Sequence, residues 1–184
     1  MKKFFLLMLA ASALLTLRAS HVTTALTSGY VFKQGHDFKR VYGHGLVNVI
    51  TFDTCYSSCG VWGGGAKLSY WRGTGHTEFL RMPTVMQQVP LTFYLRGMKE
   101  FDCRLQLYGS LGGGFTWIQE KSYLGCPRAV KGLGEIELGF SWPVHSCLFL
   151  TTAFRYLFPP QKAHSIRKID VGGVDLRAGI EFSF

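Results

Sequence analysis

Five cysteines carry the most reactive side chains of this chain, and their number is odd. Cys55, Cys59, Cys103 and Cys147 lie in or directly after short predicted connections, whereas Cys126 lies in a longer one. In a chain that meets an oxidising compartment, an odd count favours a disulfide to another protein, although a local bridge between Cys55 and Cys59 explains the pattern about equally well. Zinc would need a second pair of ligands, and none follows, so we expect no metal.

Six histidines could supply a general base for a serine nucleophile. His145 and Ser146 adjoin each other at a predicted turn, and no histidine alternates with a serine on one strand face. His44 alone lies near the expected outer end of a predicted strand, where a single histidine is more often a surface or interface residue. We therefore expect no catalytic residue, no enzymatic activity and no cofactor. A lipid A-modifying enzyme is the least favoured alternative.

The elements that must position these residues are strands, because apolar and polar residues alternate with a period of two. The pattern is almost unbroken in the C-terminal segment and weakest in the first two. The sequence predicts eight strands, at residues 26–33, 42–53, 60–72, 87–98, 103–119, 130–142, 146–158 and 170–184.

One face of these strands is apolar and rich in aromatic residues. Its aromatic residues toward the strand ends are Phe115, Trp117, Phe140, Trp142, Phe154, Tyr156, Phe182 and Phe184. The lumen of an eight-stranded barrel holds only one layer of side chains, so this set could not be packed inside. We expect these residues to face lipid instead.

The opposite face then closes a narrow interior that contains charged residues of both signs. Buried charges persist only when they are paired and hydrogen-bonded, so we expect a charge network that fills the lumen. Its predicted members are Lys67, Arg96, Arg104, Glu135, Glu137, Arg155, Asp175, Arg177 and Glu181.

The N-terminus predicts export. Lys2 and Lys3 precede an apolar run over residues 4–17 that is too short to span a bilayer, and Ala19 follows. We assign residues 1–19 to a cleaved signal peptide and residues 20–184 to one barrel domain. Odd-numbered connections between the strands are all longer than even-numbered ones. Long extracellular loops and short periplasmic turns are typical of outer-membrane barrels, so we expect a bacterial outer-membrane location.

Segment 89–117, which contains VPLTFYLRGM and LQLYGSLGGGFTW, and the ending DVGGVDLRAGIEFSF resemble the small outer-membrane β-barrel superfamily. That group includes the OmpA transmembrane domain and the OmpX and OmpW types. The resemblance implies an all-β, eight-stranded, antiparallel up-and-down transmembrane barrel. It also implies that the C-terminal strand ending in Phe184 is read by the barrel-assembly machinery. The rim cysteines are similar to those of disulfide-linked envelope proteins of chlamydia-type bacteria.

These observations predict a structural or surface-interaction protein, with a narrow porin-like channel as the first alternative. Expected partners are outer-membrane lipid, lipopolysaccharide and disulfide-linked envelope proteins. The net charge of +9 would suit nucleic acid, but the basic residues are dispersed, so we expect no such partner. Two basic loops could bind and neutralise lipopolysaccharide phosphates, although their charges are also typical of ordinary solvated loops. They contain Lys33, His36, Lys39 and Arg40, and Lys162, His164, Arg167 and Lys168.

Overall fold

The computed structural model describes residues 21–33, 40–55, 62–76, 81–101, 104–123, 125–158 and 172–184, with only the backbone described at His21 and Cys55. The predicted signal peptide therefore lies outside the described residues, as do Cys59 and Cys103. Among the described residues, no helix has the length and the apolar character needed to span a membrane.

Eight antiparallel strands close into one barrel in which every strand pairs with its neighbours in sequence, and β1 pairs with β8. The predicted eight-stranded, up-and-down barrel is thereby confirmed. The strands are β1 His21–Lys33, β2 Gly45–Cys55, β3 Trp62–His76, β4 Pro83–Glu100, β5 Gln106–Lys121, β6 Arg128–His145, β7 Leu148–Phe158 and β8 Gly173–Ser183.

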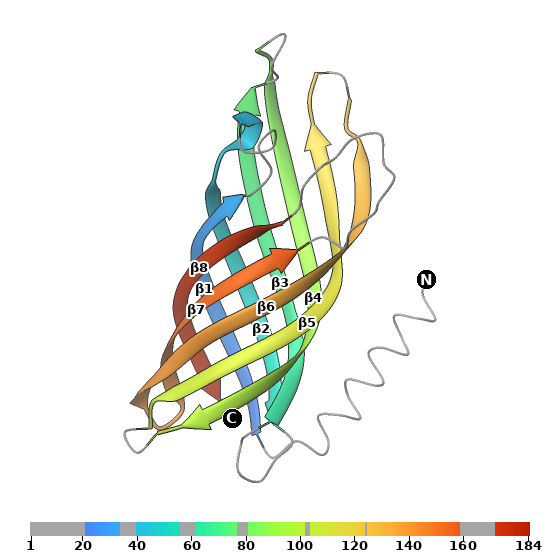
Figure 1. Cartoon of the computed structure of the whole chain (residues 1–184). Coiled ribbons are helices and arrows are strands. Elements are labelled where there is room, and N and C mark those ends of the chain that lie inside the picture. The colour runs from blue at the N-terminus through green and yellow to red at the C-terminus, as the bar shows by residue number, and fades with distance from the viewer. Residues whose placement is uncertain are drawn as a thin grey trace.

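Several strands are longer than the sequence pattern predicts. β1 begins at His21, because residues 21–25 pair with β2 and Thr23 also pairs with Ser183 of β8. β4 and β6 each contain 18 residues, whereas β7 and β8 contain 11. Figure 1 shows the result: β3 and β4 rise farthest beyond the ring of strands, at what we call the upper end. The C-terminus lies at the opposite, lower end.

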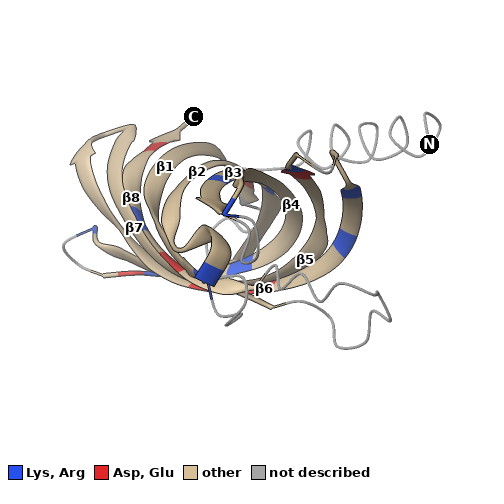
Figure 2. Ribbon diagram, turned by 90° about the horizontal axis from the view of Figure 1, so that it is seen from above, with Lys and Arg blue, Asp and Glu red and all other residues tan. Residues whose placement is uncertain are grey.

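Alternate side chains point into and away from the ring that Figure 2 shows from above. Large apolar side chains cover the outer face, and Leu95, Leu111 and Leu138 are more than half exposed there. The inner face carries buried polar and charged residues. The barrel is thus apolar outside and polar within, the reverse of a soluble barrel.

An apolar cluster fills the interior toward the upper end. It consists of Val31, Tyr42, Val47, Val49, Trp71, Met86 and Ile118. Tyr42 comes from the segment between β1 and β2, and its hydroxyl donates to Glu120 Oε1 at 2.7 Å and lies 3.2 Å from Thr84 Oγ1. Tyr42 thereby anchors the described end of this segment in the barrel interior.

We predict that Gly114→Ala destabilises the barrel, whereas Gly113→Ala has little effect. A Cβ at Gly114 would collide with the Leu91 carbonyl oxygen and stand 2.8 Å from Thr92 Cα, both backbone atoms of β4. A Cβ at Gly113 would lie 3.4 Å from its nearest neighbour, the Leu133 carbonyl oxygen. We expect a loss of about 1–3 kcal/mol at Gly114. Urea titration in detergent micelles measures it, and equal midpoints for the two variants would contradict the prediction.

Candidate functional site

Arg155 of β7 lies at the centre of the charged interior. It is fully buried, and its Nε and Nη2 atoms lie 2.9 and 2.7 Å from Asp175 Oδ2 on β8. Its Nη1 donates to Ser69 Oγ on β3 at 2.9 Å and lies 3.7 Å from Glu135 Oε2. One guanidinium therefore connects strands from opposite parts of the ring, as its planar array of donors permits.

Lys67 of β3 joins the two glutamates of β6. Its Nζ lies 2.9 Å from Glu135 Oε1 and 3.2 Å from Glu137 Oε2, and it stacks over the Tyr94 ring with 3.9 Å to the centroid. Arg177 pairs with Glu137 as well, and its Nε lies 2.8 Å from Asp175 Oδ1. Each carboxylate of this group therefore meets more than one cation.

A second cluster lies nearer the lower end and is built around Arg96. Its Nη1 donates to Asp53 Oδ2 at 2.6 Å, and its guanidinium lies over the Tyr108 ring at 3.9 Å. Glu181 is 3.7 Å from Arg96 Nη2 and accepts a hydrogen bond from Ser141 Oγ at 3.0 Å. The interaction with Asp53 is the closer one, so Glu181 has the weakest cationic partner in the interior.

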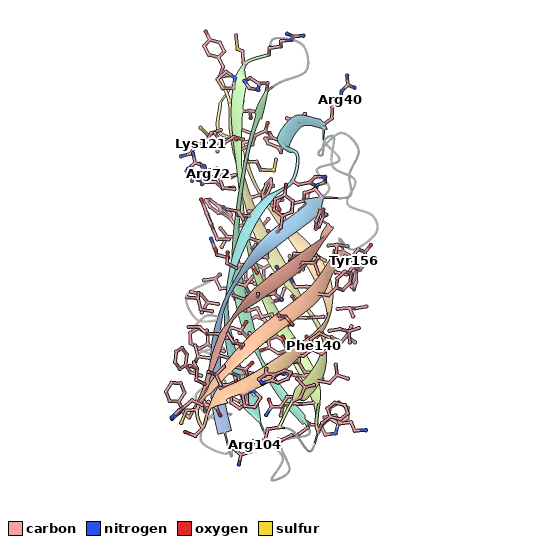
Figure 3. The ribbon with its side chains drawn as sticks, turned by 90° about the vertical axis from the view of Figure 1, so that its left-hand side faces the viewer. Arg40, Arg72, Arg104, Lys121, Phe140 and Tyr156 are labelled. Atoms are coloured by element: carbon pink, nitrogen blue, oxygen red, sulfur yellow. The ribbon has the colours of Figure 1, made fainter. Side chains whose placement is uncertain are left out.

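Eight of the nine predicted network residues are buried in the interior: Lys67, Arg96, Glu135, Glu137, Arg155, Asp175, Arg177 and Glu181. The placement of Arg104 was wrong, because this residue precedes β5, is exposed and has a φ of 59°. Its N–H donates to the Phe101 carbonyl at 2.8 Å, so Arg104 belongs to a turn. Figure 3 shows it at the lower end.

The sequence pattern missed two buried charges. Asp53 lies at the end of a stretch that is apolar on both faces, so alternation could not assign it to the inside. Lys33 was expected in a basic loop, but it ends β1, is 5% exposed and donates to Gln88 Oε1 at 2.6 Å. Lys33 Nζ also lies over the Trp71 ring at 4.6 Å from the centroid. With both residues counted, the buried described residues contribute five cations and five carboxylates, so their formal charges balance.

The space that this network leaves is small. A cavity of about 20 Å³ is bounded by residues that include Thr51, Tyr94, Glu137 and Glu181. A cavity of that size holds about one water molecule. This cavity is too small for a row of hydrated ions, and the charged side chains around it are in direct contact, which suits a structural network better than a conducting path.

The aromatic residues expected on the lipid side lie on outward positions of their strands. Phe115, Phe140, Trp142, Phe154, Phe182 and Phe184 are exposed, whereas Trp117 and Tyr156 are partly buried by their neighbours. Figure 3 shows Phe140 and Tyr156 on the outer wall.

The candidate reactive residues lie near the two ends. Cys126 and Cys147 are exposed free thiols, Cys126 beside the β5–β6 hairpin and Cys147 directly before β7. Ser146 Oγ lies 3.0 Å from His145 Nδ1, but both residues are exposed, at the end of β6 and in the turn that follows it. His44 Nδ1 accepts from the Lys33 N–H at 3.2 Å, and its ring lies near Tyr30 and Phe32. Among the residues with described coordinates, no three His, Cys, Asp or Glu side chains form a metal site.

We predict that Arg155→Met lowers the free energy of unfolding by about 3–5 kcal/mol, because it leaves buried carboxylates without their cation. Arg72→Met, at an exposed position, should change stability by less than about 0.5 kcal/mol. Adding Asp175→Asn to Arg155→Met should cost less than the sum of the single changes, since both remove the same ion pair. Urea titration in detergent micelles gives all the values. Additive effects would show that the pair is not coupled.

No model of a protein family and no characterised protein sequence matches the chain. Solved structures do. The chain is similar to the outer membrane protein OprG of Pseudomonas aeruginosa, with a TM-score of 0.68, 14% identity and coverage of 91% of this chain and 97% of that one. It is also similar to Neisserial surface protein A, with a TM-score of 0.61, 11% identity, and coverage of 89% and 97%. For Ail, the attachment invasion locus protein of Yersinia pestis, the TM-score is 0.52 and the identity is 14%, with coverage of 89% of this chain and 97% of that one. At these identities the likeness extends to the barrel fold, and it gives no support to an origin in chlamydia-type bacteria.

Proposed function

We propose that the protein is an integral barrel of the bacterial outer membrane with a structural or surface-interaction role and no enzymatic activity. The observation that carries this proposal is the reversed distribution of polarity. Apolar side chains such as Leu95 and Leu138 are exposed on the outer wall, whereas charged side chains such as Arg155 and Glu135 are fully buried. Hydrocarbon, unlike water, is a favourable surrounding for such an outer wall.

The barrel relatives in structure support the same location. OprG is described as an outer membrane protein, Neisserial surface protein A as a surface protein and Ail as an attachment invasion locus protein. A surface-interaction role fits the upper end, where β3 to β6 extend beyond the other strands. We place that end outside the cell and the lower end in the periplasm. Export would use the signal peptide, and assembly would use the C-terminal strand that ends in Phe184.

The filled interior favours this role over a narrow channel. Ions would have to cross a region where Arg155, Lys67 and their carboxylates are in direct contact and the cavity is about 20 Å³. A lipid A-modifying activity has little support from the described histidines, because His44 is engaged with the Lys33 backbone and aromatic rings. The outer wall and the upper end are therefore the working surfaces that we propose.

Orientation can be tested with the two free thiols at opposite ends. A membrane-impermeant polyethylene glycol maleimide should label Cys126 on intact cells, whereas Cys147 should react only after permeabilisation and reduction. Gel shifts measure the labelling. In the Cys126→Ser variant the label on intact cells should disappear, while in Cys147→Ser it should persist. Labelling of Cys147 on intact cells would reverse the orientation, and a mature chain that stays monomeric in buffer without detergent would exclude the membrane location.

We also propose that Cys147 links the barrel to a neighbouring envelope protein. Its backbone carbonyl accepts from the Ser183 N–H at 3.0 Å, which fixes the exposed thiol beside the C-terminal strand at the rim. The predicted contributions of Cys59 and Cys103 lie outside the described residues, and for Cys55 only the backbone is described.

Native membranes run on gels without reductant should therefore contain high-mass species that collapse to monomer on reduction. Cys147→Ser should weaken these bands, because it removes the exposed thiol at the periplasmic rim. Cys126→Ser serves as the control and should leave them unchanged. Monomer in both lanes would contradict cross-linking.

A further inference from the structure

We infer that the outer wall of β3 to β6 carries a binding site for the phosphate groups of a phosphorylated glycolipid, as found in lipopolysaccharide. The inference rests on the proposed function, since it takes the upper end to face the outer leaflet. It assigns the lipid contact to strand residues rather than to the basic loops that the sequence suggested.

The site is a continuous row across four neighbouring strands. Arg72 of β3 is paired with Gln87 of β4, Gln87 with Gln119 of β5, and Gln119 with Arg128 of β6. All four residues occupy outward positions by strand alternation. Neighbouring strands are about 4.8 Å apart, so the backbone positions of the two arginines are separated by about 14 Å. Lys121, two residues above Gln119 on the same face, adds a third cation.

A row of different chemistry lies directly below. Two residues toward the lower end, the same outward face carries Tyr70, Val89, Trp117 and Val130. Val89 pairs with Trp117 and Trp117 with Val130, so this row is continuous from β4 to β6. Two residues of a strand span about 7 Å. A cationic row therefore borders an aromatic and apolar row, which suits a ligand with an anionic head and acyl chains.

The cations of the upper row have no protein partners among the described residues. Arg72, Lys121 and Arg128 are exposed, and none forms an ion pair in the part of the chain that the structure describes. Glu120, the carboxylate nearest in sequence, lies on the inward face and accepts from Tyr42. Among the described residues, Glu100 is the one exposed carboxylate, and it lies at the lower end of β4.

Figure 3 shows Arg72 and Lys121 projecting from the outer wall near the upper end, far from Arg104. Charge that is matched inside the barrel is thus unmatched here. Arginine binds phosphate through two parallel hydrogen bonds, and Gln87, which is partly exposed between the two arginines, adds an amide donor, whereas Gln119 is buried in the row. The expected ligand is a lipid with phosphates on a sugar headgroup, whose acyl chains lie against Tyr70, Trp117 and Val130.

The experiment compares two double variants of the purified mature protein in detergent micelles. Arg72→Gln with Arg128→Gln removes two cations from the row. Lys99→Gln with Arg104→Gln removes two exposed cations from the lower end and is the matched control. Native mass spectrometry measures the binding of lipid A with both phosphates and of dephosphorylated lipid A, and inorganic pyrophosphate is added as a competitor. Migration of unboiled samples on gels reports that each variant is folded.

We expect the first variant to bind lipid A at least about tenfold more weakly than the unmodified protein, because it loses charge-assisted hydrogen bonds. The control should bind normally, and dephosphorylated lipid A should bind the unmodified protein as weakly as lipid A binds the first variant. Unchanged binding, or an equal loss in the control, would overturn the site. Displacement by equimolar pyrophosphate would assign it to free phosphate instead. Thiol labelling that supports the orientation, together with no lipid A binding, would reject this inference and leave the proposed function standing.

Discussion

The pairing of charges inside the barrel is the constraint on which the rest of the structure depends. An isolated buried charge is prohibitively costly, so each interior charge needs a partner from another strand. Arg155 reaches Ser69, 86 residues away in sequence, and Arg177 donates to Thr27, 150 residues away. These contacts form only when the ring is closed. The ion pair of Lys67 with Glu135 likewise joins β3 to β6, so closing the ring completes the neutralisation of these two charges.

The filled interior determines what the outer face must be. Because side chains of both signs and the apolar cluster around Trp71 occupy the lumen, the large apolar residues have no interior space to enter. They remain outside, and in the outer-membrane location that we propose a bilayer surrounds them. Above this apolar wall, the longer strands β3 to β6 carry polar outward residues. The length difference between β4 and β8 thus produces a rim with a surface chemistry of its own on one side of the barrel.

The sequence predicted the barrel and most of its interior because alternation is a local property. In β6 to β8 the two faces differ at nearly every position, so the sides of Glu137, Arg155 and Asp175 could be assigned. Asp53 could not, since the residues before it are apolar on both faces. Arg104 was misplaced because the alternating pattern continues through a turn, where a φ of 59° ends it. The ion pairs themselves depend on register and tilt between strands, which no local pattern contains.

Balanced charge also indicates where recognition can occur. Five buried cations face five buried carboxylates among the described residues, so the interior exerts little net attraction on a charged ligand. The cations on the outer wall are in the opposite situation: Arg72, Lys121 and Arg128 are exposed and form no ion pairs with described residues. An anionic partner gains attraction there without displacing an existing pair. The interior charges therefore stabilise the barrel, and the unpaired cations on its outer wall are the groups that we expect to bind an anionic ligand.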